Sequence, residues 1–188
     1  MPVSEYFILA EDCPVDIPSR DEIVALCRSA GYSRSRSGIP FPYQTPGPIS
    51  AWIKFGTNAT MDEALTQDAV GKILNANPEA AVRVPRVFQA FTTPNFDYPI
   101  GYIVMEYIDF PDCDKGDVQL VAQAVQELIG VKGPSDAPGH VGGGLVVHRF
   151  FYEWTSPAPY KTVKELEDHV NSVSEHHSPL SLGDMRPQ

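Results

Sequence analysis

The stretch from Ile49 to Pro78 constrains the fold most, because a strand pattern runs into a helix pattern with almost no loop between them. ISAWIKF is β-branched and aromatic, and its alternation places Trp52 and Lys54 on the same face of a strand. Gly56 ends this strand, and TMDEALTQDAVGKILNANP then predicts a helix capped by Thr60. The two elements can therefore meet with little loop to order. The opposite face of the strand is predicted to carry Ile49, Ala51, Ile53 and Phe55.

Other periodic segments surround this unit. They predict helices over 20–30, 118–129 and 162–170, and β-rich segments over 82–91 and 100–108. The turn-rich loop TTPNFDYP indicates that the two β-rich segments pair antiparallel. SRSRSGIPFPYQTPGP is predicted to be a loop or a poorly paired edge, because its prolines cannot donate to a ladder. The chain is therefore expected to be α+β, with a small, largely antiparallel sheet and a helical second region.

Helical spacing also predicts which faces are buried. In the helix that begins at Thr60, Leu65, Ala69 and Ile73 fall on one face, with Val70 beside them. The helix over 118–129 is also amphipathic, with Val121, Ala124, Val125 and Leu128 spaced for one face.

Charge and cysteine usage narrow the function classes. The chain has 14 Lys and Arg against 24 Asp and Glu, and the formal net charge of -10 opposes binding to nucleic acid. A nucleotide remains a candidate ligand, because a phosphate tail needs only one or two placed cations and backbone amides. The three widely spaced cysteines form no zinc or disulfide pattern, and no segment resembles a signal peptide or a membrane span. We expect a cytoplasmic protein with no membrane partner.

Lys54 and Glu63 are the candidate site residues that the residue pattern alone supports. A lysine on a strand and a carboxylate on the next helix can form a charge-assisted pair that presents the ammonium to a phosphate. Each residue also has a plain structural interpretation. Lys54 can be a solvated strand charge, and Glu63 stands at capping-box distance from Thr60.

The order IKFG, DEALTQ, VPRV, IVMEYI closely resembles the amino-terminal lobe of the aminoglycoside phosphotransferase-like family, a protein-kinase-like family, particularly its fungal members. The resemblance runs from about Ile49 to Asn171 and includes VGGGLVVHRFFYEWTSP and TVKELEDHVN of the connecting region. It implies a kinase-like amino-terminal lobe over 1–110, followed over 111–188 by a connector and the truncated start of a carboxy-terminal lobe.

The resemblance also implies site residues and ligands. Lys54 would bind the phosphates of ATP, Glu63 would pair with Lys54, and Glu106, Tyr107 and Ile108 would form the hinge, mostly through backbone atoms. ATP with Mg²⁺ would be the cofactor pair and a small hydroxyl compound the acceptor. The chain departs from the family before Lys54, where TPGPIS replaces a glycine-rich loop and its prolines offer no N–H to a phosphate.

The carboxy-terminal residues leave two functions open. LGDMRPQ is similar to the family's catalytic loop only in part, with Asp184 at the position of the catalytic aspartate and no metal-binding motif after it. The chain is thus expected to be either a truncated or variant phosphotransferase or a catalytically inactive module that binds a nucleotide or a protein. Apolar stripes on the helices and the aromatic run RFFYEW further predict exposed apolar surface and self-association.

Overall fold

The computed structural model describes residues 8–9, 13, 17–31, 38–95 and 98–176. By compactness the chain divides into two units, Met1–Lys132 and Gly133–Gln188. This division falls later in the chain than the boundary that the family resemblance implies at residue 110. The first unit contains β1 Ile8–Leu9, α1 Arg20–Ala30, β2 Ile39–Phe41, β3 Ala51–Gly56, α2 Met61–Leu74, β4 Val87–Thr93, β5 Ile100–Glu106, the 3-10 turn Lys115–Asp117 and α3 Val118–Gly130.

The first unit is built on one antiparallel sheet with the strand order β1-β4-β5-β3-β2. The prediction of an α+β chain with a largely antiparallel sheet is therefore confirmed, and so is the antiparallel pairing of the two β-rich segments as β4 and β5. β5 lies between β3 and β4, with Lys54 directly opposite Ile103. The edge strand β2 falls inside the proline-rich segment, and the two-residue strand β1 was not predicted.

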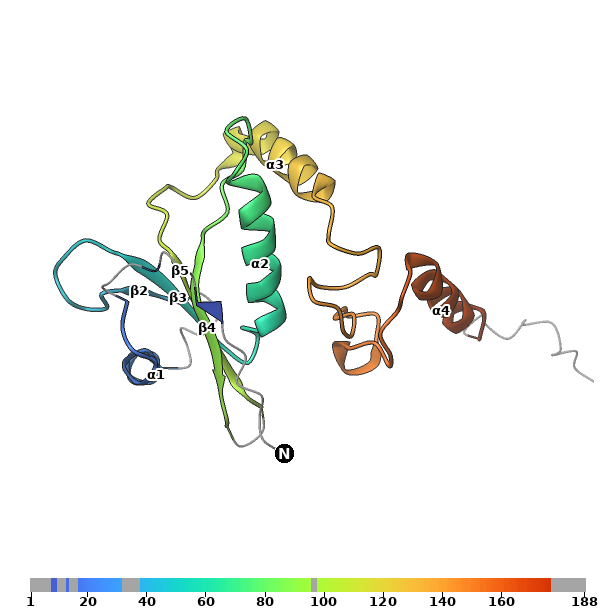
Figure 1. Cartoon of the computed structure of the whole chain (residues 1–188), viewed down its shortest axis with the longest axis horizontal. Helices are drawn as coiled ribbons and strands as arrows, with labels where there is room; N and C mark the ends of the chain where they lie inside the picture. Colours follow the sequence, from blue (N-terminus) through green and yellow to red (C-terminus); the bar gives the residue numbers. More distant parts are fainter. Residues whose placement is uncertain (1–7, 10–12, 14–16, 32–37, 96–97, 177–188) are drawn as a thin grey trace, which may run out of the picture. The chain divides into compact units, whose positions relative to one another are not determined.

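The sheet is covered on both faces, by α1 on one side and by α2 on the other (Figure 1). The predicted alternation of β3 explains this arrangement, since its apolar and mixed faces point in opposite directions. Ala51, Ile53 and Phe55 are buried with Ile23 and Cys27 of α1. The other face packs Ala64 of α2 against Ile103 and Ala90. Ile49 lies outside the strand and is 38% exposed.

The predicted buried face of α2 is wrong. Its buried residues are Ala64, Gly71 and Leu74, whereas Ile73 is 50% exposed. Polar contacts decide the rotation of this helix, because its apolar residues are spread around the axis. The Asn75 amide donates to the carbonyl of Val84 at 2.8 Å, and its oxygen accepts from the Val84 N–H at 3.0 Å.

The side chain of Cys27 on α1 points into the core and is only 2% exposed. Burial raises the pKa of the Cys27 thiol to about 12, so at pH 8 it stays protonated, and the thiolate is the form that alkylates. Cys113 is exposed.

We expect a pulse of iodoacetamide at pH 8 to label Cys113 at least about 100-fold faster than Cys27. Peptide mass spectrometry measures both rates, and unfolding in urea should make them similar. Equal labelling of the two cysteines in the native chain would contradict the burial of Cys27.

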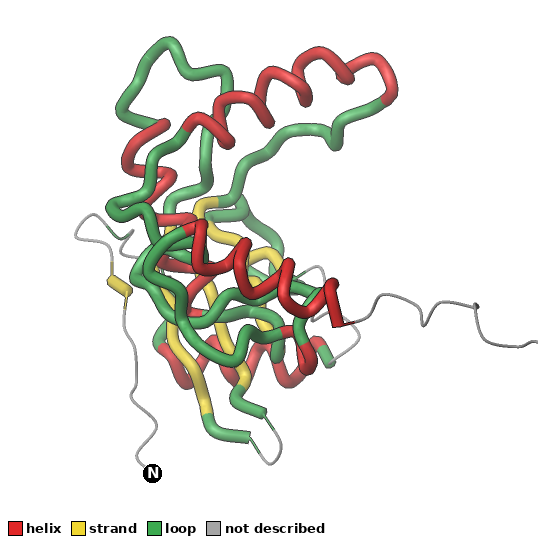
Figure 2. Tube along the Cα trace, turned by 90° about the vertical axis from the view of Figure 1, so that its right-hand side faces the viewer, coloured by secondary structure: helices red, strands yellow, loops and turns green. Residues whose placement is uncertain are grey.

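Helix α3 stands clear of the strands in both ribbon views (Figures 1 and 2). None of its residues is buried. In its predicted apolar stripe, Ala124 is partly buried, and Val121, Val125 and Leu128 are exposed. The predicted apolar face is therefore present on α3, and the expectation that apolar surface of this helix stays exposed is confirmed for the described residues. Among those residues, no helix is long and apolar enough to cross a bilayer.

The second unit has a small core of its own, beside the 3-10 turn Tyr152–Trp154 and helix α4 Val163–His176. Phe151 and Tyr160 are buried, and the Tyr160 hydroxyl lies 2.9 Å from Nδ1 of His169 on α4. Ser156 is also buried, and its hydroxyl accepts from the Val146 N–H at 2.9 Å.

Candidate functional site

The candidate site begins with Lys54 on β3, which lies between β5 and the edge strand β2. Its side chain projects on the face that α2 covers, two residues beyond Trp52 on the same face. Its ammonium forms an ion pair and a hydrogen bond with Oε1 of Glu63. The ion pair predicted from the sequence is therefore confirmed. The two side chains remain 30% and 35% exposed, so ligands can reach the pair.

Glu63 is presented to Lys54 by the start of α2. The Thr60 hydroxyl caps this helix by accepting the Glu63 N–H at 3.1 Å. The Glu63 carboxylate bonds Lys54, so the backbone and the side chain of this residue have separate partners. Thr60 is thus the cap that the sequence predicted, and the Glu63 side chain is used for the lysine.

Gly101 lets α2 approach the sheet closely enough for this pair to form. A Cβ atom at this position on β5 would overlap the carbonyl oxygen of Ala59 and lie 2.8 Å from its carbonyl carbon. Ala59 immediately precedes the Thr60 cap, so the whole start of α2 rests against β5 at this glycine. Side-chain contacts further along hold the helix, since Gln67 donates to the Pro85 carbonyl at 2.8 Å.

Aromatic rings lie beside the pair, at the end of the strand nearest the predicted hinge. Trp52 and Tyr107 stack with their ring centroids 6.4 Å apart and an interplanar angle of 25°. Both residues are partly exposed. Gly38 allows this position of the Trp52 ring, because a Cβ there would lie 2.7 Å from its Nε1 atom. Lys54 and the stacked rings thus present a cation and an aromatic surface along one strand.

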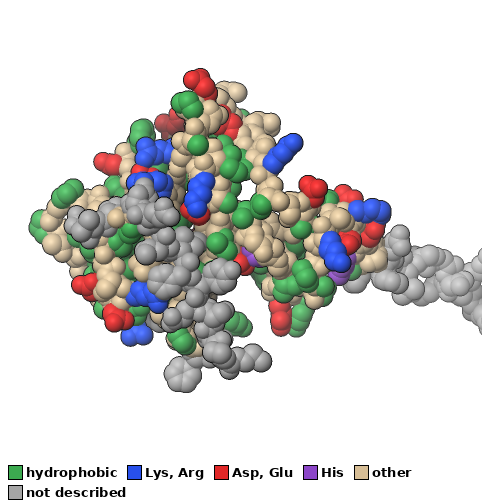
Figure 3. Space-filling model, in the orientation of Figure 1, with side chains coloured by type: hydrophobic (Ala, Val, Ile, Leu, Met, Phe, Trp, Pro, Cys, Tyr) green, Lys and Arg blue, Asp and Glu red, His purple; other side chains and the backbone are tan. Residues whose placement is uncertain are grey.

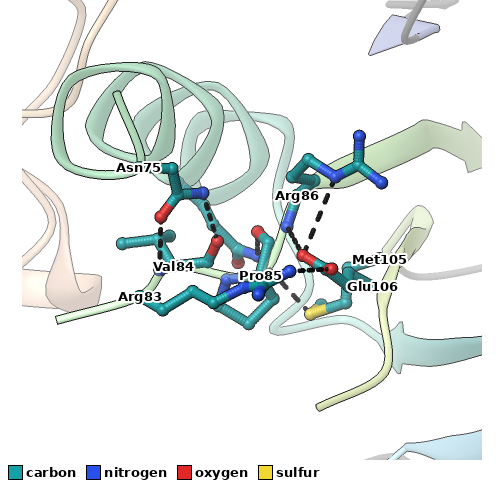
Figure 4. Close-up of polar contacts among 8 residues, drawn as sticks. Asn75, Arg83, Val84, Pro85, Arg86, Met105 and Glu106 are labelled. Carbon is teal, nitrogen blue, oxygen red and sulfur yellow. Dashed lines mark hydrogen bonds and ion pairs between the residues drawn. The ribbon is translucent and has the colours of Figure 1, made fainter. Parts of the chain in front are cut away.

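The hinge residues predicted from the family resemblance differ in their hydrogen bonds and ion pairs. The Glu106 carboxylate binds the Arg83 guanidinium, lies 3.8 Å from Nε of Arg86 and accepts the Arg86 N–H at 3.3 Å (Figure 4). The Glu106 N–H donates to the Arg86 carbonyl at 2.8 Å. Its side chain therefore ties the end of β5 to the segment that precedes β4.

Tyr107 and Ile108 follow the end of β5. The Tyr107 hydroxyl lies 3.5 Å from Oδ1 of Asp109, and the Ile108 carbonyl accepts from the N–H of Phe110 at 3.1 Å. Among the described residues, the N–H of Ile108 has no hydrogen-bond acceptor. This amide is the hinge group that a ligand edge could use.

The arginine pair on Glu106 was missed by the sequence reasoning. Arg83 and Arg86 stand three residues apart around Pro85, which keeps the segment extended. A basic residue on each side of a proline before a strand is only weak evidence for an ion pair, because the sequence does not reveal which carboxylate lies near it. The sheet register supplies that partner by placing Glu106 beside the start of β4.

Other groups bear on catalysis and on ligand binding. Asp184, the predicted catalytic residue, lies outside the described residues. Within the described part of the chain, no group of three or more His, Cys, Asp or Glu side chains could hold a metal ion. A hollow of about 430 Å³ beside Asn75 and Arg83 and another of about 690 Å³ beside Leu26 and Phe41 are both lined without Lys54 or Glu63.

The part of the described surface that Figure 3 shows has no single sign of charge. On the face shown in Figure 3, acidic and basic side chains are interspersed with apolar ones.

The chain was also compared with protein-family models, with curated proteins and with solved structures, and none of the three comparisons found a match.

Proposed function

We propose that the first unit binds a nucleoside triphosphate, with the Lys54 ammonium on its phosphates and the Glu63 carboxylate holding that ammonium in place. The ion pair between β3 and α2 is the observation that carries this proposal. A lysine ammonium has three donors, and Glu63 takes one of them, so two remain for a phosphate. The partial exposure of both side chains keeps these donors accessible.

The order of the elements supports assignment to the aminoglycoside phosphotransferase-like family. IKFG lies on β3, DEALTQ lies on α2, and VPRV leads into β4. IVMEYI covers the end of β5 and the two residues after it. β5 lies between β3 and β4, so the lysine strand adjoins the strand that leads into the predicted hinge. ATP is the nucleotide that the resemblance implies, and a small hydroxyl compound is the implied acceptor.

The distance along β3 suits a nucleotide. Trp52 precedes Lys54 by two residues, which is about 7 Å along a strand, and its ring stacks on Tyr107 next to the free N–H of Ile108. A triphosphate at Lys54 would place its base toward these rings and the hinge. Base stacking and one backbone hydrogen bond would then position the base.

The fit is weaker for other parts of a phosphoryl-transfer site. Pro42, Pro46 and Pro48 interrupt the segment before β3, so it offers few N–H donors for phosphate oxygens. No group of described residues matches the oxygen ligands of Mg²⁺. These observations favour the second candidate function, a module that binds a nucleotide without transferring its phosphoryl group.

Tryptophan fluorescence tests the proposed binding. The chain has two tryptophans, Trp52 and Trp154, so a Trp154→Phe variant reports on Trp52 alone. ATP should change the Trp52 emission saturably, with a smaller or weaker response to adenosine, which has no phosphate. An unchanged emission up to millimolar ATP would refute a nucleotide site at this strand.

We further expect the 188-residue chain not to turn over ATP with aminoglycosides or other small alcohols, because phosphoryl transfer needs a positioned base and metal ligands. Product formation is measured by chromatography with and without Mg²⁺. Mg²⁺-dependent product that disappears in Asp184→Asn would overturn this expectation and establish Asp184 as a working catalytic residue.

A further inference from the structure

Helix α3 carries an apolar stripe with the spacing of a helix-helix seam. Val118, Val121, Val125 and Leu128 recur at alternating intervals of three and four residues and are 61%, 41%, 45% and 44% exposed. Such spacing places side chains at the a and d positions of a heptad, where they interlock with the same positions of a facing helix. The partner that this pattern suits is therefore another helix with similar spacing.

α3 is also almost free of charge, in a chain whose formal net charge is -10. Glu127 is its one charged residue, and both carboxylate oxygens accept the Ala81 N–H, at 3.1 and 2.9 Å. Ala122 beside these residues is small, and so is Ala124, which belongs to the same predicted apolar face. Two acidic chains can thus approach each other here without placing like charges in the contact.

We propose that a second copy of this chain covers the stripe, so that α3 packs against α3 in a two-fold dimer. This inference is independent of nucleotide binding at Lys54. It follows from the seam spacing and from the missing charge, which together make the face complementary to itself.

The charges at the two ends of α3 favour an antiparallel arrangement. The segment before the helix contains three acidic residues and one basic residue, which are Asp112, Asp114, Asp117 and Lys115. Lys132 lies two residues after the end of the helix. Antiparallel packing brings Lys132 of each copy toward the acidic end of the other, whereas parallel packing aligns the two acidic ends.

The dimer is expected to be weak. A helix of 13 residues is about 20 Å long, and one such seam covers less than the roughly 1,200 Å² of a stable interface. We therefore expect association at protein concentrations of tens to hundreds of micromolar rather than nanomolar.

Sedimentation equilibrium tests the proposal on the full chain. The mass of the wild type should rise from 20.7 kDa toward twice that value as the concentration increases, while Val125→Glu should stay monomeric over the same range. Gln123→Glu adds the same charge on the opposite side of α3 and should behave as the wild type. Circular dichroism checks that both variants keep their helix content.

The same experiment tests the orientation. Lys132→Glu should weaken association at least several-fold, whereas Lys72→Glu, which makes the same change in net charge on α2, should not. An unchanged dimer in Lys132→Glu would overturn the antiparallel arrangement. A wild type that stays at 20.7 kDa, or a dimer unaffected by Val125→Glu, would overturn the proposal itself.

Discussion

Replacing Gly101 by alanine is expected to destabilise the first unit by about 3 kcal/mol. The added Cβ would overlap the carbonyl oxygen of Ala59, which is backbone and cannot rotate away. Either β5 or the start of α2 must shift, and both belong to the packed core around Ile103 and Ala64. A shift of α2 would also draw Glu63 away from Lys54.

Urea unfolding followed by circular dichroism measures this loss as a lower midpoint at an unchanged slope. Gly130→Ala is the matched control, because a Cβ at Gly130 would meet no atom within 4 Å. That variant should keep the stability of the wild type or raise it slightly, because alanine favours a helical backbone. Equal stability of Gly101→Ala and the wild type would show that α2 does not rest on β5 as described.

Replacing Lys54 by methionine is expected to weaken ATP binding about 10- to 100-fold, because a charge-assisted hydrogen bond to phosphate contributes roughly 1.5–3 kcal/mol. The fold should survive, since a partly exposed ion pair contributes about 1 kcal/mol or less to stability. Methionine keeps the length of the side chain and its packing while removing the ammonium. The dissociation constant is measured by calorimetric titration with ATP.

Two further variants separate binding from a general charge effect. Lys72→Met removes an exposed lysine of α2 that pairs with Asp68 at 2.8 Å, and it should leave the ATP affinity unchanged. Glu63→Gln leaves the Lys54 ammonium in place but no longer holds it by charge, so it should weaken binding less than Lys54→Met. Equal affinities for Lys54→Met and the wild type would remove Lys54 from the site.

Strand β3 and its site were predictable because short-range patterns determine them. Alternation along ISAWIKF placed Ala51, Ile53 and Phe55 in the core and left Lys54 on the other face. Because the connection from β3 to α2 is short, Glu63 in the first turn of α2 lies close to Lys54. A period of two residues and a tight turn are local properties, so the sequence reveals them directly.

The rotation of α2 was not predictable in the same way. Its apolar residues point in several directions, and the buried face depends on Asn75 and Gln67 meeting carbonyls of the extended segment before β4. These partners lie 9 and 18 residues away in the sequence. The clamp of Arg83 and Arg86 on Glu106 likewise depends on the register of β4 against β5. Long-range pairing of this kind leaves no periodic signal.

Labelling with an acyl phosphate of ATP tests the central claim most directly. In this reaction a lysine amine near the terminal phosphate attacks the acyl carbonyl, forms an amide and releases ATP. The chain has six lysines, and peptide mass spectrometry distinguishes them. We predict that Lys54 is acylated preferentially and that excess ATP protects it. Labelling spread over exposed lysines such as Lys72 and Lys164, with no protection by ATP, would contradict nucleotide binding at Lys54.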